Sequence, residues 1–288
     1  MELFQYPYMQ RALIGALVIG LAAPALGIYL VQRRLALIGD GVGHVALTGV
    51  GAGLLLNRSP VLVAVIAATI GAVTIEVVRS RGRTSGDLAL ALLFYGGIAG
   101  GVMLVGLSDS TSANLNAYLF GSLTTISPAD LTTIAVLGVA ILVTMLALRP
   151  ALFAVSHDEE YARVSGLPVR TLNLLIAVTT AVTVTIAMRA VGVLLISALM
   201  VVPVATAQQV TRGFRSTMTA AMALGLFAAG AGVWVAATAD TAPGASVVLL
   251  AIASFAVVAG AGAAWRALRR RSTPAPEPAP EPHEVVLH

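Results

Sequence analysis

Long apolar runs are the feature of this sequence that most constrains its fold. A helix needs about 20 mostly apolar residues to cross the roughly 30 Å hydrocarbon core of a bilayer. Nine stretches are long enough, namely 12–31, 35–56, 61–78, 88–107, 129–148, 171–189, 191–210, 217–237 and 246–265. The sequence therefore predicts an all-α, polytopic integral membrane protein with about eight or nine transmembrane helices, which form a transmembrane domain over residues 1–265.

The composition supports this fold class. Only 10% of the 288 residues are charged and the mean hydropathy is +0.93, whereas about 25% of the residues in a soluble domain are charged. The runs lack the alternation typical of outer-membrane barrel strands. The run 115–126 is too short to span, so we expect an interfacial or re-entrant helix there. Residues 266–288 are rich in Pro and Glu, and we expect a disordered cytoplasmic tail.

The arginines predict which loops are cytoplasmic. All 17 basic residues are arginine, and most of them gather at the ends of the apolar runs. Cytoplasmic loops carry an excess of basic residues, so we expect the following groups on the cytoplasmic side: Arg33 and Arg34; Arg79, Arg81 and Arg83; Arg149, Arg163 and Arg170; Arg212 and Arg215; Arg266, Arg269, Arg270 and Arg271.

This arrangement predicts a multi-pass protein of the inner or plasma membrane, with its N-terminus outside and its C-terminus cytoplasmic. The net charge of +4 follows from the arginines that flank the spans. We therefore expect membrane lipid and no nucleic acid as a partner.

One carboxylate and one imidazole stand in the second apolar run, LALIGDGVGHVALTGVGAG. Asp40 and His44 are four residues apart, so they share one face of a helix. An acidic residue costs roughly 2.5–3.5 kcal/mol at the bilayer centre, and something must offset that cost. Three explanations fit the pair: a mutual hydrogen bond, a proton relay, and a transit site for a divalent metal that binds imidazole and carboxylate.

A metal site would be incomplete in one chain. A closed Zn²⁺ site has four ligands, and the sequence contains no cysteine, so thiolate ligands are excluded. A two-fold dimer with this helix near its axis would supply two aspartates and two histidines. Two small-xxx-small pairs, a pattern that lets membrane helices approach closely, fit such packing: Gly39 with Gly43, and Gly49 with Gly53.

Two segments resemble the membrane permease subunits of ABC importers for zinc, manganese and iron. They are RRLALIGDGVGHVALTGVGAG and, later, VGVLLISALMVVPVATA at residues 191–207. The segments LNAYLFGSLTTIS and HDEEYARVSGLPVR resemble the family's outer loop and its ATPase-contacting segment. The resemblance covers about residues 4–265, in order and spacing. The chain departs from the family at Thr48, where relatives often have a proline.

The resemblance implies roles and partners. It assigns metal coordination within the membrane to Asp40 and His44. It implies a homodimer, two copies of a cytoplasmic ATP-binding subunit and an extracytoplasmic metal-binding protein. The cargo would be Zn²⁺ or Mn²⁺, with Fe²⁺ as a third candidate, and no permanently bound cofactor is expected. From the residues alone, a proton-coupled secondary metal transporter that uses the same pair as a relay stays open, as does a passive channel.

ATP hydrolysis is expected on a separate subunit, so the chain itself is not predicted to be an enzyme. A P-loop needs a lysine, and this sequence contains none. The best surface for docking an ATPase is the segment that contains His157, Asp158, Glu159, Glu160, Tyr161, Ala162, Arg163 and Gly166. Here HDEEYARV predicts two helical turns, with acids at the positive end and Arg163 at the other. The alternative is a solvated loop.

Other polar residues have structural explanations. Glu76 and Arg79 are spaced for an i,i+3 ion pair. The stretch Ser127-Pro128-Ala129-Asp130 predicts a capped helix start. Arg189 is expected at the outer membrane interface.

Overall fold

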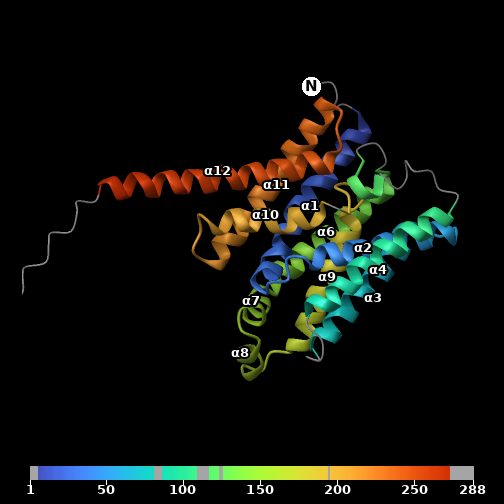
Figure 1. The fold of residues 1–288 in the computed structure, drawn as a ribbon, viewed down its shortest axis with the longest axis horizontal. Helices are drawn as coiled ribbons and strands as arrows, with labels where there is room; N and C mark the ends of the chain where they lie inside the picture. Colours follow the sequence, from blue (N-terminus) through green and yellow to red (C-terminus); the bar gives the residue numbers. More distant parts are fainter. Residues whose placement is uncertain (1–5, 81–85, 109–116, 123–125, 194, 273–288) are drawn as a thin grey trace, which may run out of the picture.

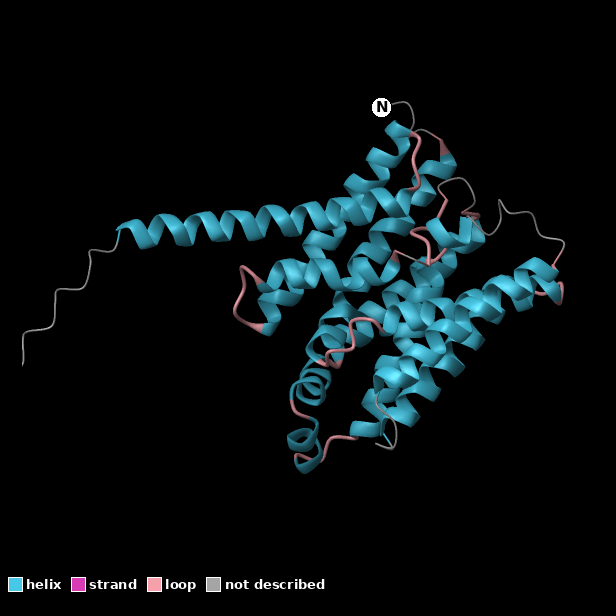
Figure 2. Cartoon of the chain, in the orientation of Figure 1, coloured by secondary structure: helices cyan, strands magenta, loops and turns pink. Residues whose placement is uncertain are grey.

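The computed structural model describes residues 6–80, 86–108, 117–122, 126–193 and 195–272. These residues form helices joined by loops, and they contain no strand (Figure 2). The all-α membrane fold is therefore confirmed. The helices are α1 (Pro7–Gln32), α2 (Ile38–Leu55), α3 (Pro60–Ser80), α4 (Gly86–Leu107), α6 (Pro128–Ala147), α7 (Arg149–His157), α8 (Glu159–Val164), α9 (Val169–Ala187), α10 (Ile196–Gln208), α11 (Phe214–Ala239) and α12 (Pro243–Ser272).

Eight of these helices are long and apolar enough to cross a membrane: α1, α2, α3, α4, α6, α9, α11 and α12. The predicted span at 191–210 is wrong as a continuous helix. It contains only the 13 residues of α10, which reach about 20 Å. Before α10, Gly192 has φ +93°, and the Val193 N–H donates to the Tyr118 carbonyl at 3.0 Å. The backbone here bonds to a distant segment instead of continuing a helix.

The helix ends define two ends of the bundle. At the end that we call the Asp130 end, Asp130 and Arg189 form an ion pair at 2.9 Å beside Ser59. At the opposite end, called the Glu159 end, one cavity brings Arg79 and Arg163 beside Glu159. Figure 1 shows α7 and α8 projecting here.

The described arginines of the predicted cytoplasmic turns gather at the Glu159 end. Arg34 lines a second cavity together with Arg79, and Arg170 lines the first. Arg149 and Arg215 lie together around a third cavity, where the Phe153 and Phe214 rings are 4.8 Å apart. Four of the five predicted cytoplasmic arginine groups are therefore represented at one end of the bundle, whereas α12, which carries the fifth group, extends away from it (Figure 1).

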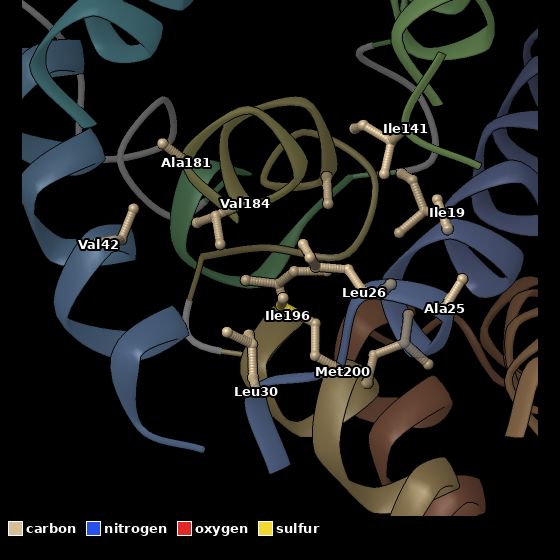
Figure 3. Packing of buried hydrophobic residues seen from close by; sticks show 14 of the residues in the cluster. Ile19, Ala25, Leu26, Leu30, Val42, Ile141, Ala181, Val184, Ile196 and Met200 are labelled. Atoms are coloured by element: carbon tan, nitrogen blue, oxygen red, sulfur yellow. The ribbon is translucent and has the colours of Figure 1, made fainter. Parts of the chain in front are cut away.

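Helix α1 runs through the core. All residues from Ala22 to Leu30 are buried, so this part of α1 is surrounded by other helices and does not face lipid. Figure 3 shows Leu26 and Leu30 of this helix beside Ile196 and Met200 of α10. The buried Tyr29 hydroxyl donates to the Met145 carbonyl at 2.9 Å, so the polar group has a partner.

Two predicted segments reach the limits of the description. Residues 117–120 of the predicted re-entrant run are helical, and most of the rest of that run lies outside the described residues. Helix α12 continues to Ser272 and extends away from the bundle (Figure 1). Residues 273–288 lie outside the described residues, so the disordered tail stays a prediction.

Candidate functional site

Asp40 lies in the first turn of α2, at the Glu159 end of the bundle. The helix begins at Ile38, and a cavity at its start is also lined by Arg79. Backbone N–H groups of a first helical turn carry a positive partial charge that favours a carboxylate. The half-buried Asp40 side chain is therefore stabilised by its own helix. Its position away from the middle of the span further reduces the cost of placing an acid in the membrane.

His44 follows one turn later and is almost fully buried, with 7% of its surface exposed. The ring of Phe94 on α4 meets it edge-on, with 4.5 Å between the ring centroids. No described residue forms a hydrogen bond with Nδ1 of His44. An unsatisfied buried polar atom costs about 1–3 kcal/mol, so this nitrogen is a candidate for binding a ligand from outside the chain.

Asp40 and His44 do not satisfy each other in the structure. No hydrogen bond or ion pair joins these two described residues, and Nδ1 of the ring lacks any protein partner. The mutual pairing considered from the sequence is therefore not the arrangement that the protein adopts. The Asp40 carboxylate oxygens and Nδ1 of His44 therefore remain available to bind another group.

Helix α4 approaches α2 closely because Gly97 faces His44. A Cβ atom on Gly97 would lie 2.6 Å from the carbonyl carbon of His44 and 2.7 Å from the Val45 nitrogen. The Thr48 hydroxyl donates to the Gly97 carbonyl at 2.7 Å, so it ties the two helices together. Thr48 lies inside the unbroken helix α2.

One chain supplies only part of a metal site. Among the described residues, no group of three or more His, Cys, Asp or Glu side chains could hold a metal ion. Asp40 and His44 thus offer one carboxylate and one imidazole from consecutive turns. These are ligand types for Zn²⁺, Mn²⁺ or Fe²⁺, and they are two of the four ligands that a closed Zn²⁺ site has.

The glycines of α2 pack within the chain, which corrects the expectation that they face a second copy. The first pair contacts α10 and the segment before it, with Gly39 against Ser197 and Gly43 against Val193. The second pair contacts the start of α3, where Gly49 meets Ala64 and Gly53 meets Pro60. A small-xxx-small pattern allows close approach but does not identify the partner helix.

The predicted docking segment has the expected local structure. Asp158 caps α8 by accepting the Tyr161 N–H at 2.9 Å, and the helix runs to Val164. Gly166 follows with φ +79°, a conformation that favours glycine. His157 belongs to the end of α7, where its ring stacks on Phe153 at 5.5 Å. Whether the segment docks an ATPase stays a prediction.

The surface of α8 is suited to contact with another protein. Tyr161 and Val164 are 67% and 89% exposed, and Glu160 and Arg163 are exposed as well. Ala162 is fully buried, so it anchors the short helix to the bundle. The short helix therefore presents both apolar and charged side chains outward.

Several residues around these sites were not singled out from the sequence. Phe94 and Gly97 sit in an apolar helix, and only the Gly96-Gly97 doublet hinted at a close approach there. The predicted Glu76 and Arg79 pair is confirmed, since Arg79 donates to both carboxylate oxygens at 3.0 and 2.8 Å. Its extension to Glu159 at 3.7 Å has no signal in the sequence.

The predicted cap at the start of α6 is confirmed. Ser127 and Asp130 form a capping box, in which the Asp130 N–H donates to the Ser127 hydroxyl at 3.1 Å. The ion pair between Asp130 and Arg189 adds a tie between this helix start and the end of α9. The helix cap and the ion pair thus give Asp130 and Arg189 structural roles.

Comparison with known proteins identifies the group of proteins that share this arrangement. A model of the ABC 3 transport family matches residues 5–261. The chain is 31% identical over 257 residues to the manganese transport system membrane protein MntC of Halalkalibacterium halodurans, which covers 89% of this chain and 88% of that protein. It is 31% identical over 238 residues to the high-affinity zinc uptake system membrane protein ZnuB of Haemophilus influenzae, covering 83% and 91%.

A solved structure has the same fold. It is PsaBC from Streptococcus pneumoniae in complex with Fab, and one of its chains matches with a TM-score of 0.80 and 28% sequence identity. The match covers 88% of this chain and 92% of that chain. The arrangement of helices in this chain therefore occurs in a solved structure.

Proposed function

Because the chain belongs to the ABC 3 transport family, we propose that it is the permease subunit of an ABC importer that moves divalent metal ions into the cell. The observation that carries this proposal is the pair on α2. A half-buried carboxylate and a buried imidazole lie one turn apart, and Nδ1 of His44 lacks a protein partner. The names of the relatives as manganese and zinc transport proteins support a divalent metal as cargo.

The transport site is proposed to be shared between two copies of the chain. Each copy supplies Asp40 and His44, so a homodimer reaches the four donors that a closed Zn²⁺ site has. Mn²⁺ and Fe²⁺ accept the same donor types, and their selection depends on geometry and availability. The metal is cargo, so no resident cofactor is needed.

Energy for import is proposed to come from two cytoplasmic ATP-binding subunits. The docking surface on each permease is the segment that includes α8, with His157 through Arg163 and Gly166. An extracytoplasmic metal-binding protein would deliver the ion at the Asp130 end. We assign residues 1–265 to the transmembrane domain and residues 266–288 to a cytoplasmic tail.

Reconstitution with the candidate ATP-binding subunit tests the function. The purified permease is expected to bring this subunit along, and proteoliposomes loaded with ATP should accumulate Zn²⁺ or Mn²⁺ delivered from outside. Vesicles loaded with ADP should not. Uptake that follows a pH gradient without ATP would instead establish the proton-coupled carrier, and flux that needs neither energy source would establish a passive channel.

Two serines at opposite ends of the bundle test the orientation. Ser59 is exposed at the Asp130 end and Ser165 is exposed at the Glu159 end. In this cysteine-free chain, an impermeant maleimide added to intact cells should label Ser59→Cys and not Ser165→Cys. Permeabilised cells should show both. Labelling of Ser165→Cys in intact cells would place α8 outside and remove the basis for ATPase docking.

The serine that is replaced must be exposed for the label to reach it. Ser156 lies nearby, in the last turn of α7, but it is buried with 7% exposure. A cysteine there would resist labelling on either side of the membrane. Ser165 avoids this ambiguity because its side chain is accessible at the C-terminal end of α8.

A further inference from the structure

Arg79, near the end of α3, borders two cavities at once. One of about 620 Å³ lies against α8 and is lined by Glu159 and Arg163. The other, about 380 Å³, lies against the turn between α1 and α2 and is lined by Leu37 and Ile38. The same guanidinium thus lies between the proposed docking helix and the segment that starts the Asp40 helix.

On its own helix, Arg79 is held firmly by Glu76. Its Nε and Nη2 atoms donate to the two oxygens of that carboxylate at 3.0 and 2.8 Å. Glu76 is 4% exposed, and a bidentate pair with a buried carboxylate is strong and geometrically specific. This contact fixes the position of the guanidinium relative to α3.

On the α8 side, Arg79 meets Glu159 across helices. The Nη2 and Oε2 atoms are 3.7 Å apart, and the two side chains are 26% and 35% exposed. Asn173 of α9 also donates to Glu159 at 3.2 Å. A half-exposed ion pair at this distance is weak, so it can break and re-form while the contact with Glu76 persists.

On the α2 side, Arg33 extends the charge cluster. It is the C-cap of α1, and no described residue forms a hydrogen bond with its buried Nη2 atom. Burial lowers the pKa of the Arg33 guanidinium and the charge of Arg79 lowers it further, whereas Glu76 and Glu159 raise it. Arg33, which begins the turn before Asp40, is therefore influenced by the two carboxylates that contact Arg79.

We infer that the ion pair between Glu159 and Arg79 links movement of α8 to the position of the turn between α1 and α2, which precedes Asp40. This link couples ATP hydrolysis to metal release. This inference rests on the proposed function, because it takes α8 as the helix that the ATP-binding subunit moves. It assigns Glu159 and Arg79 as positioning residues that touch neither metal nor ATP. Arg79 has a strong bidentate contact with Glu76 and a weak ion pair with Glu159. This combination fits a link that switches between two states.

Glu159→Gln removes the ion pair with Arg79, and it also removes an exposed i,i+4 pair within α8, where Nη2 of Arg163 lies 3.7 Å from Oε1 of Glu159. Glutamine keeps the size and the oxygen that accepts from Asn173, but it loses the charge that attracts Arg79. The matched comparison is Glu160→Gln, which removes one charge from the same turn of α8, where the side chain is exposed. Glu160 forms no ion pair within the described part of the chain. Each variant removes one negative charge from α8. If this lost charge alone weakens binding of the ATP-binding subunit, both variants should show the same weakening.

The measurement is the number of metal ions imported per ATP hydrolysed, in proteoliposomes that contain the permease and its ATP-binding subunit. Allosteric couplings usually amount to a factor of 5 or more, so Glu159→Gln should lower this ratio at least about fivefold. Glu160→Gln should keep the wild-type ratio even if its total rate falls. An unchanged ratio in Glu159→Gln, or an equal fall in both variants, would overturn the link.

A distance measurement tests the movement itself. Leu37 in the turn between α1 and α2 is 65% exposed, so a spin label on Leu37→Cys should be tolerated. Trapping the complex with ADP and vanadate should move the Leu37 label relative to a second label at Ser59→Cys on the Asp130 end. This shift should be lost in Glu159→Gln. If Leu37 moves equally in both proteins, the inference fails.

The wild-type complex tests the proposed function separately from the link between Glu159 and Arg79. A wild-type complex that imports metal with ATP, combined with an unaltered Glu159→Gln variant, rejects the link and leaves the importer intact. A wild-type complex that imports without ATP rejects the importer and the link together.

Discussion

Asp40→Asn is expected to abolish metal uptake while the protein still inserts in the membrane and binds its ATP-binding subunit. Asparagine keeps the size of the side chain but removes the anionic ligand. Loss of residues that merely support a metal ligand already costs 10–100-fold in metal affinity or activity, so uptake should fall by at least about 100-fold. Metal accumulation in proteoliposomes is the measurement, with the protein level normalised by quantitative blotting.

Asp240→Asn is the matched control for the same chemical change. Asp240 is exposed at the C-cap of α11 with φ +51°, a conformation that asparagine adopts readily. It lies at the Asp130 end, in a cavity with Ser122, where no metal ligand is proposed, so uptake of free metal added without the metal-binding protein should stay near the wild-type rate. Comparable losses in Asp40→Asn and Asp240→Asn would point to a general effect of charge on folding.

His44→Leu distinguishes a metal site from a structural pair. If both residues act on one ion, His44→Leu should be as inactive as Asp40→Asn, and the double variant should be no worse, because groups that work as a unit are not additive. If the pair were only structural, replacing both partners by apolar residues would be neutral or stabilising. A double apolar variant with wild-type uptake would contradict the metal assignment.

Local patterns in the sequence predicted the parts of the fold that depend on neighbouring residues. Apolar runs of about 20 residues located eight crossing helices, because hydropathy depends only on composition within the run. The spacing of Asp40 and His44 placed them on one face, since helical geometry fixes this over a single turn. Asp158 and Gly166 marked the ends of a short helix that the structure places at Glu159–Val164.

Hydropathy could not show that the helix in the seventh apolar run has only 13 of its 20 residues. The segment before α10 is as apolar as a spanning helix, but its backbone pairs with residues 118–121. Gly121 and Gly192 both have positive φ, and a Cβ atom on Gly121 would lie 2.7 Å from the Ala190 carbonyl oxygen. Such contacts join residues about 70 positions apart, so no local pattern reports them.

The sequence also did not predict which distant residues contact the glycines of α2 and Arg79. The glycines of α2 were compatible with a second copy or with helices of the same chain, and the structure assigns them to α3, to α10 and to the segment before α10. Arg79 was predicted to pair with Glu76 three residues away, whereas its contact with Glu159 joins two distant turns. Sequence spacing within one helix predicts contacts, but spacing across helices does not.

Gly97→Ala is expected to damage both stability and transport through a single added methyl group. The new Cβ would lie 2.6 Å from the backbone of His44, which cannot move without shifting α2. Overpacking of this kind usually costs about 1–3 kcal/mol, and here the displaced backbone carries the proposed imidazole ligand. We expect a lower midpoint of thermal unfolding in detergent and a clear loss of metal uptake.

Gly96→Ala is the control for this substitution, because the neighbouring glycine has no heavy atom within 4 Å of an added Cβ. Alanine is about 1 kcal/mol more favourable than glycine inside a helix, so Gly96→Ala should leave the protein as stable as the wild type or slightly more so. The two changes add the same methyl group to adjacent positions of α4, and only one of them meets His44. Equal effects in both variants would show that α4 responds to helix propensity and not to contact with α2. Opposite effects would establish that the close approach at Gly97 holds the imidazole in place.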